Sequence, residues 1–153
     1  MSSRKVCVTA ADGNTGFLIA ELILKHRDFS GKVAGVVGLA LDPDSDHAKE
    51  LKELGATIAL KETGCDTICL VPPAHQHKIE ICEELARAAK KADIVNVCLI
   101  SSAGCDYAER DKQHRLREFI DLESLVLEAK GDPSTSTGTS ARVIRQVIYM
   151  IEE

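Results

Sequence analysis

The residues best suited to bind a ligand lie near the amino end, in a predicted turn over residues 10–16. The turn reads Ala-Ala-Asp-Gly-Asn-Thr-Gly, a G-x-x-G-x-x-G pattern with alanine in the first place. It follows an apolar run at residues 5–9 that is typical of a buried strand, and it opens an apolar run at residues 16–26 that predicts a helix. Such a turn brings backbone N–H groups to a helix N-terminus, where these donors and the helix dipole favour a pyrophosphate.

Two glycines and one alanine decide how this turn is interpreted. Gly13 would let phosphates approach the backbone, and Gly16 would let the helix pack on the strand. Ala10 tolerates fewer backbone conformations than glycine, so a turn that merely connects two elements is the alternative interpretation.

Apolar runs that alternate with helical patterns predict the rest of the fold. The predicted strands are residues 5–9, 33–41, 56–60, 67–71, 94–100 and 142–150, and the predicted helices are residues 16–26, 47–54, 74–92 and 108–130. Alternation of this kind predicts an α/β fold, a Rossmann-like doubly wound parallel sheet of five to six strands. The helix over residues 16–26 has few polar positions, so we expect it to be buried on much of its circumference.

The composition predicts one globular domain over residues 1–153, since 44% of the residues are hydrophobic and 28% are charged. The net charge of −5 and the scarcity of aromatic residues disfavour direct nucleic-acid binding. The six cysteines form no C-x-x-C pair and match no zinc spacing, so we expect no metal site and buried, reduced thiols. No leader peptide or membrane-spanning run is expected, and a reducing compartment, the cytoplasm or also the nucleus, is predicted.

A dinucleotide site of this type places an acidic residue on the ribose about 20 residues beyond the turn. The end of the second predicted strand offers Asp42 somewhat further on, and an acid in an ordinary turn is the alternative. No arginine lies near this position in the sequence to bind the 2′-phosphate of NADP. The sequence therefore predicts NAD or NADP as the cofactor without choosing between them.

The sequence resembles the NmrA-like family, atypical members of the short-chain dehydrogenase/reductase superfamily. The matching stretches are VTAADGNTG at residues 8–16, TICLVPPA at 67–74, VNVCLISSAG at 95–104 and VIRQVIY at 143–149. The resemblance implies a Rossmann fold and an NAD(P)-binding site. The resemblance implies that the family's phosphate-binding turn falls on Ala10, Asp12, Gly13, Asn14, Thr15 and Gly16. The family's segment after the fourth strand falls on Val71, Pro72 and Pro73. Its segment after the fifth strand falls on Ser101 and Ser102, where a loop is predicted to begin. For the two prolines, simple strand termination is the alternative.

The sequence departs from enzymes of the superfamily at their usual Tyr-x-x-x-Lys pair, so no catalytic residue is assigned. Tyr107 is followed at that spacing by Asp111, whose charge would oppose phenolate formation. Relatives also continue beyond the last matching stretch into a substrate- or partner-binding part, which this chain is expected to lack.

The connection between the third and fourth predicted strands, residues 61–66, is too short for the helix that the family has there. Either residues 56–62 are themselves the crossover and the third strand is lost, or a taut linker replaces the helix.

Three functional hypotheses remain open from the sequence. The first is a non-catalytic NAD(P)-binding module that acts as a redox sensor, and the second is an NAD(P)H-dependent oxidoreductase of small carbonyls or quinones. The third is a relative without retained binding that is stabilised by self-association or by a protein partner, because uncovered sheet edges recruit another chain.

Overall fold

The computed structural model describes residues 4–29, 31–59, 64–128 and 140–146. Its elements are β1 (Arg4–Val8), α1 (Asn14–Lys25), β2 (Val33–Leu39), α2 (Asp46–Glu53), β3 (Thr57–Ala59), β4 (Thr67–Leu70), α3 (Lys78–Lys91), β5 (Asn96–Ser102), α4 (His114–Glu128) and β6 (Ser140–Gln146). The predicted alternation of strands and helices is therefore confirmed.

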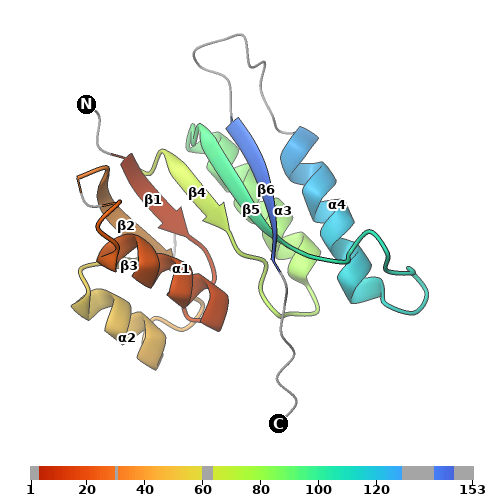
Figure 1. Ribbon diagram of the computed structural model, residues 1–153, viewed down its shortest axis with the longest axis horizontal. Coiled ribbons are helices and arrows are strands. Elements are labelled where there is room, and N and C mark those ends of the chain that lie inside the picture. The colour runs from red at the N-terminus through yellow and green to blue at the C-terminus, as the bar shows by residue number, and fades with distance from the viewer. Residues whose placement is uncertain (1–3, 30, 60–63, 129–139, 147–153) are drawn as a thin grey trace.

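The strands form one six-stranded sheet in the order β3-β2-β1-β4-β5-β6, and every neighbouring pair is parallel. The arrowheads of the strands point the same way in Figure 1. The strand order reverses between β1 and β4, which is the doubly wound, Rossmann-like topology predicted from the sequence. In such a sheet ligands bind beyond the carboxyl ends of the strands at the point of reversal.

The two faces of the sheet are covered by different helices (Figure 1). On one face, Val6 and Val8 of β1 pack with Phe17 and Ala20 of α1. On the other face, one cluster joins β1, β2 and β4 to α3, and a second joins β4, β5 and β6 to α3 and α4. Alternate residues of each strand therefore enter different halves of the core, as the two-residue period of a strand requires.

Helix α1 is less buried than its composition predicts. Only Gly16, Phe17 and Ala20 of this helix are buried, whereas the side chains of Leu18 and Leu22 are 58% and 52% exposed. The expectation of burial on much of the circumference is wrong, because α1 contacts one face of the sheet and α2 but has no described helix on its outer side.

The third strand is retained, in three residues, so the interpretation in which it is lost is wrong. Residues 60–63 of the β3–β4 connection lie outside the described part, but the register at its two ends fixes the span. Ala59 lies level with Leu39, and Thr67 lies level with Val6, three residues nearer the amino edge of the sheet. Three residues of descent, about 10 Å, and three strand spacings, about 14 Å, give a diagonal of about 17 Å. The eight Cα steps from Ala59 to Thr67 can reach about 26 Å. The span that the linker must cross is thus shorter than its maximum reach, because β3 ends after three residues.

Some boundaries differ from the sequence prediction. Ser101 and Ser102 continue β5 and do not begin a loop, because β5 pairs with β6 as far as Ser102↔Gln146. Helix α4 begins at His114, six residues later than predicted, since turns occupy residues 103–112. The predicted final strand extends to residue 150, but residues 147–150 lie outside the described part, as do residues 129–130 of the predicted fourth helix.

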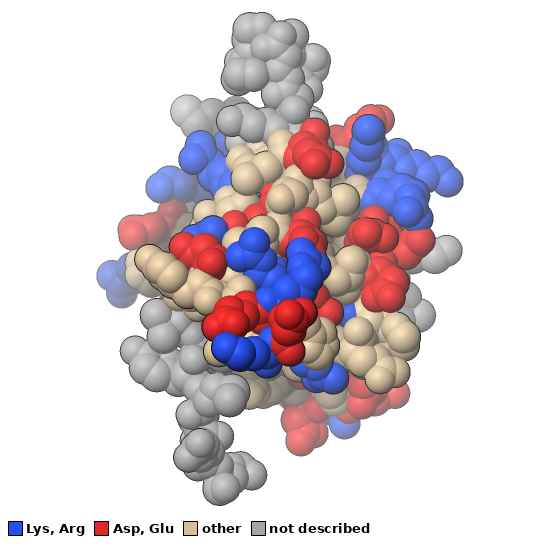
Figure 2. All heavy atoms as spheres, turned by 90° about the vertical axis from the view of Figure 1, so that its right-hand side faces the viewer, with Lys and Arg blue, Asp and Glu red and all other residues tan. Residues whose placement is uncertain are grey.

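The surface around α4 carries charges of both signs. Acidic and basic side chains lie interspersed on this side in Figure 2. Arg110 pairs with Asp121 at 3.2 Å, and Lys112 pairs with Glu109 at 2.8 Å. Within the described ranges, no helix combines the length and the apolar composition needed to cross a membrane.

Candidate functional site

The turn between β1 and α1 leaves backbone donors available at the start of the helix. Gly13 is the N-cap residue, in an extended conformation, and it has no side chain that could accept a hydrogen bond. The N–H of Phe17 donates to the Gly13 carbonyl oxygen at 2.9 Å. In the described part of the chain nothing accepts the N–H groups of Asn14, Thr15 or Gly16. Three adjacent donors at the positive end of a helix are suited to a phosphate group.

Gly16 is the glycine that the packing of this turn requires. A Cβ atom at position 16 would lie 2.1 Å from the carbonyl oxygen of Ala10 and 2.7 Å from that of Thr9. At Gly13 the nearest atom to such a Cβ, the Ala10 oxygen, is 3.4 Å away, which is an ordinary contact. Helix α1 therefore approaches the end of β1 through Gly16, while Gly13 keeps the space above the turn open.

Ala10 occupies the first glycine position with a conformation that glycine favours. Its φ is +49°, in the left-handed region, where a Cβ atom costs roughly 1–2 kcal/mol. Alanine therefore adopts at this position the left-handed conformation that glycine adopts without strain.

Asp12 and Asp42, the two acidic residues expected at the site, lie next to each other. The N–H of Asp42 donates to Asp12 Oδ2 at 2.9 Å, and the N–H of Asp44 donates to Asp42 Oδ1 at 3.0 Å. The ring of His47 donates from Nδ1 to the Asp12 carbonyl oxygen at 3.0 Å and stacks on Phe17 with ring centroids 4.4 Å apart. The end of β2 is thus attached to the phosphate turn, and the Asp42 carboxylate is exposed beside it.

Thr9 fixes the segment after β4 against the turn. Its buried hydroxyl donates to the Val71 carbonyl oxygen at 3.0 Å and accepts the Val71 N–H at 2.8 Å. This double contact joins the carboxyl ends of β1 and β4, where the strand order reverses. Val71, Pro72 and Pro73 consequently lie beside the phosphate turn.

Two cavities open on either side of this junction, and both are lined by Val71 and Pro73. The smaller, about 140 Å³, lies between the ends of β1, β2 and β4 and includes Ala10 and Leu41. The larger, about 450 Å³, lies between the ends of β4, β5 and β6 and the first turns of α1, α3 and α4. Its lining residues are Thr15, Val71, Pro72, Pro73, Ala74, His75, Lys78, Ile100, Ser101, Arg115, Leu116, Phe119 and Gln146.

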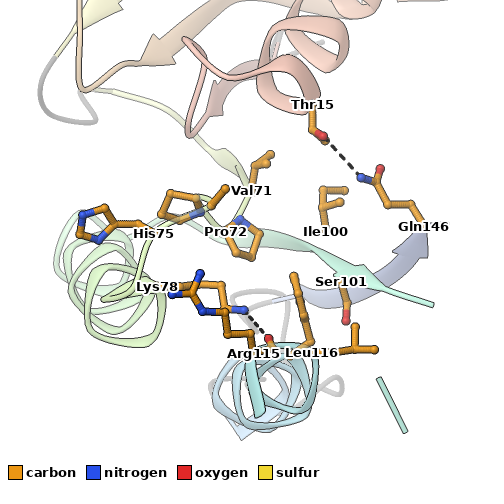
Figure 3. Close-up of a pocket in the computed structure, with 13 residues that line it drawn as sticks. Thr15, Val71, Pro72, His75, Lys78, Ile100, Ser101, Arg115, Leu116 and Gln146 are labelled. Carbon is orange, nitrogen blue, oxygen red and sulfur yellow. Dashed lines mark hydrogen bonds between the residues drawn. The ribbon is translucent and has the colours of Figure 1, made fainter. Parts of the chain in front are cut away.

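Figure 3 shows how the larger cavity is bounded. At one side, Gln146 Nε2 donates to Thr15 Oγ1 at 3.5 Å, which connects the end of β6 to the start of α1. At the other side, Lys78 Nζ donates to the Arg115 carbonyl oxygen at 2.6 Å and pairs with Glu118 at 3.0 Å. The same ammonium group lies 4.2 Å from the centre of the Phe119 ring. Lys78 therefore holds α3 against α4 and is engaged on several sides.

Ser101 contacts the buried carboxylate of Glu123, which pairs with the exposed Arg145. Its hydroxyl donates to Glu123 Oε1 at 2.5 Å, and Arg145 donates to both oxygens of the same carboxylate at 2.9 and 2.8 Å. The hydrogen bonds from Arg145, with a smaller contribution from Ser101, lower the pKa of Glu123 against the opposing effect of burial. Ser101 is thus held in one position at the floor of the cavity.

The structure brings most of the predicted site residues to one edge of the sheet. Thr15, Val71, Pro72, Pro73 and Ser101 line the larger cavity. Ser102 is buried at the end of β5 but is not among the lining residues, and its hydroxyl donates to the Ala103 carbonyl oxygen at 3.4 Å.

Sequence reasoning missed Lys78, Arg115, Phe119 and Gln146. Their helical or strand patterns predict an element but not the distant element that each residue faces. Tyr107, by contrast, is 86% exposed and is not among the residues that line either cavity.

Solved structures share this fold. An NADPH-dependent quinone oxidoreductase of Escherichia coli in complex with NADPH matches with a TM-score of 0.63 and 17% identity, over 80% of this chain and 44% of that one. A Citrobacter triphenylmethane reductase complexed with NADP(H) matches with a TM-score of 0.59 and 15% identity, over 76% and 44%. A Bacillus halodurans protein described as an NAD-dependent epimerase/dehydratase matches with a TM-score of 0.65 and 18% identity, over 99% and 73%.

At these identities the likeness establishes the fold alone, and this chain spans less than half the length of the two reductases. No family profile matches the sequence, and no curated protein matches it.

Proposed function

We propose that residues 1–153 form one NAD(P)-binding domain of the NmrA-like type, in which the dinucleotide lies across the carboxyl ends of β1 and β4. The observation that carries this proposal is the set of available N–H donors of Asn14, Thr15 and Gly16 at the start of α1. The cofactor residues that we propose are Ala10, Asp12, Gly13, Asn14, Thr15, Gly16, Asp42, Val71, Pro72, Pro73, Ser101 and Ser102.

The two cavities support a ligand with two halves joined at the phosphate turn. Ala10 lines the smaller cavity and Thr15 the larger, so a pyrophosphate on the turn would direct one half of a dinucleotide into each. In this arrangement the adenosine half occupies the smaller cavity, next to Asp42, and the nicotinamide half occupies the larger. The solved neighbours that bind NADPH or NADP(H) support a nicotinamide dinucleotide as the ligand.

We infer a non-catalytic, redox-sensing role for this domain in the cytoplasm or nucleus, with a protein as the partner of the bound form. Tyr107 is exposed and lies on neither cavity, so it does not supply the proton donor that a carbonyl reductase needs. Ser101 and Lys78, two polar side chains of the larger cavity, are already bonded to Glu123 and to Arg115 and Glu118. Their roles in this structure are to hold the cavity walls.

The alternative is an NAD(P)H-dependent oxidoreductase of small carbonyls or quinones. The size of the larger cavity, about 450 Å³, favours it, because a nicotinamide ring and a small second molecule fit such a volume. Cofactor oxidation measured over a panel of quinones and aldehydes separates the two roles: turnover that disappears in a variant unable to bind the dinucleotide establishes the enzyme.

Calorimetric titration with NAD, NADH, NADP and NADPH tests dinucleotide binding, which both proposed functions require. Asn14→Asp changes a single amide to a carboxylate at the start of α1, where a negative charge stabilises a helix but repels a phosphate. We expect this variant to fold at least as stably as the parent and to bind about tenfold more weakly, about 1.4 kcal/mol. Ser124→Asp adds the same charge at an exposed position near the other end of α4 and should leave binding unchanged. Absence of binding of all four dinucleotides at millimolar concentration would overturn the proposal and favour the interpretation in which binding has been lost.

A further inference from the structure

Cys69 and Cys98 stand directly opposite each other on neighbouring parallel strands. The register pairs Cys69 of β4 with Cys98 of β5, and Cys98 in turn with Arg142 of β6. Opposed residues on adjacent strands are about 4.8 Å apart, which lies within the Cα separation of about 4.4–6.8 Å that a disulfide bridges. The two cysteines share the face of the sheet that α1 covers, since Cys69 belongs to the cluster of Val8 and Ile100 and Cys98 packs against it.

The two thiols differ in environment. Cys69 is 8% exposed, while Cys98 is partly exposed. In the described part of the chain α1 contacts β1 and β2, and α4 contacts β5 and β6 from the opposite face. Among the described residues no helix covers the β5–β6 half of the α1 side, and Ile144 on the same side is 52% exposed. Small solutes can reach Cys98 from this side, whereas Cys69 lies deeper.

The electrostatic surroundings favour the thiolate at Cys98. A hydrogen bond from the Cys69 thiol lowers the pKa of Cys98 to about 7, with a further contribution from the positive charge of Arg142, although burial opposes both. The same hydrogen bond and burial raise the pKa of Cys69. The contrast with Cys82 is clear, because burial raises the pKa of that thiol to about 12. Reactive cysteines are those that combine access, a neighbouring cation and a low pKa.

We propose that Cys98 is a site of reversible oxidation by a peroxide, and that Cys69 resolves the oxidised form into a disulfide across β4 and β5. This inference does not depend on dinucleotide binding. The Cys98 thiolate attacks one peroxide oxygen, the O–O bond breaks, and hydroxide leaves, so that Cys98 becomes a sulfenic acid and hydrogen peroxide is reduced. The Cys69 sulfur, after losing its proton, attacks the Cys98 sulfur, and the S–O bond breaks. In sum, two thiols and one hydrogen peroxide give one disulfide and two waters.

The unmodified protein offers the first test. In the folded chain at pH 7, we expect Cys98 to react with iodoacetamide at least about tenfold faster than Cys82, because Cys98 is partly exposed and its surroundings favour the thiolate, whereas Cys82 is fully buried. Rates measured by mass spectrometry on the two cysteines of the same molecule share one folding state. A rate at Cys98 equal to that at Cys82 would overturn the proposal without any variant.

The second test identifies the disulfide. After one equivalent of hydrogen peroxide, tryptic peptides 62–78 and 92–110 should become linked, and dithiothreitol should separate them. These peptides also contain Cys65 and Cys105, so Cys65→Ser and Cys105→Ser are the matched controls and should retain the link. Cys69→Ser should abolish it and leave a sulfenic acid on Cys98 that dimedone labels, and Cys98→Ser should abolish both products. A link that survives Cys69→Ser or is lost in Cys65→Ser contradicts the assignment.

Discussion

Gly16 and the Ala10 carbonyl group are packed so closely that a single added carbon at Gly16 would overlap the backbone, with only 2.1 Å between that carbon and the Ala10 oxygen. We expect Gly16→Ala to destabilise the fold by about 3 kcal/mol or more, since overpacking against rigid backbone cannot be relieved by a side-chain rotation. Urea unfolding monitored by circular dichroism measures the effect. Gly13→Ala, where the same distance is 3.4 Å, is the control and should change stability by less than about 1 kcal/mol. Equal effects of the two substitutions would contradict the packing that places α1 on β1.

The folded protein should become more stable when Ala10 is replaced by glycine. Its φ of +49° is strained for alanine and free for glycine. The greater freedom of glycine in the unfolded chain offsets part of this gain, so we expect Ala10→Gly to raise the free energy of unfolding by about 0.5–1 kcal/mol. Ala11→Gly removes a methyl group from a fully buried neighbour and should lower stability instead. A loss of stability in both variants would show that the strain at Ala10 is not relieved.

The ion pair between the buried carboxylate of Glu123 and the exposed Arg145 should make stability depend on acid pH. The pKa of Glu123 is lowered in the folded state, chiefly by Arg145, so its contribution is fully present above the unfolded pKa of about 4.3 and is lost as the pH falls through the folded pKa. Glu123→Gln removes the charged acceptor of Ser101 and Arg145 and should cost about 1 kcal/mol at pH 7, because solvent reaches the exposed Arg145 and weakens the pair. The difference in unfolding free energy between parent and variant should shrink between pH 5 and pH 3.

The matched control for this prediction is Glu84→Gln, which removes one partner of an exposed pair with Arg87. Exposed pairs contribute little, so its effect should be small at every pH. A difference for Glu123→Gln that stays constant down to pH 3 would contradict the prediction.

Asp42 should favour NAD over NADP. Its exposed side chain follows β2, and its N–H donates to the Asp12 carboxylate on the β1–α1 turn, so a 2′-phosphate would meet two nearby acidic residues and a ribose diol would meet acceptors. We expect NAD to bind at least about tenfold more tightly than NADP, about 1.4 kcal/mol. Asp42→Asn should reduce that ratio, while Asp44→Asn should leave it unchanged. Tighter binding of NADP than of NAD by the parent protein would reverse the assignment of Asp42.

The local patterns of this sequence predict the elements well and the site only in part. The turn over residues 10–16 is predictable because strand, glycines and helix follow one another directly in the chain. The start of α1 at Asn14, two residues earlier than predicted, follows from the cap conformation of Gly13, which composition does not reveal. Ser45 caps α2, since its hydroxyl accepts the Ala48 N–H at 3.2 Å.

Long-range contacts account for what the sequence does not reveal. Lys78 reads as an ordinary charged residue at the start of a helix, and only the position of α4 shows that it is buried against Phe119. The partial exposure of Cys98 likewise depends on what covers the sheet, since the run IVNVCLI alone predicts a strand buried on both faces. The polar residues before α4 are of types that also occur in helices, so the sequence predicts too early a start for this helix. The helical spacing of apolar residues begins only at Leu116.

The three-residue length of β3 limits how short the β3–β4 connection can be. Because β3 ends after a short rise, the chain can return to the amino edge of β4 without a helix, so strand length and connection length can shorten together. If β3 were two residues longer and the linker unchanged, the distance to cross would come much closer to the maximum length of the linker. A shorter connection would therefore require a shorter β3, whereas a shorter β3 alone would leave the connection more reach than it needs.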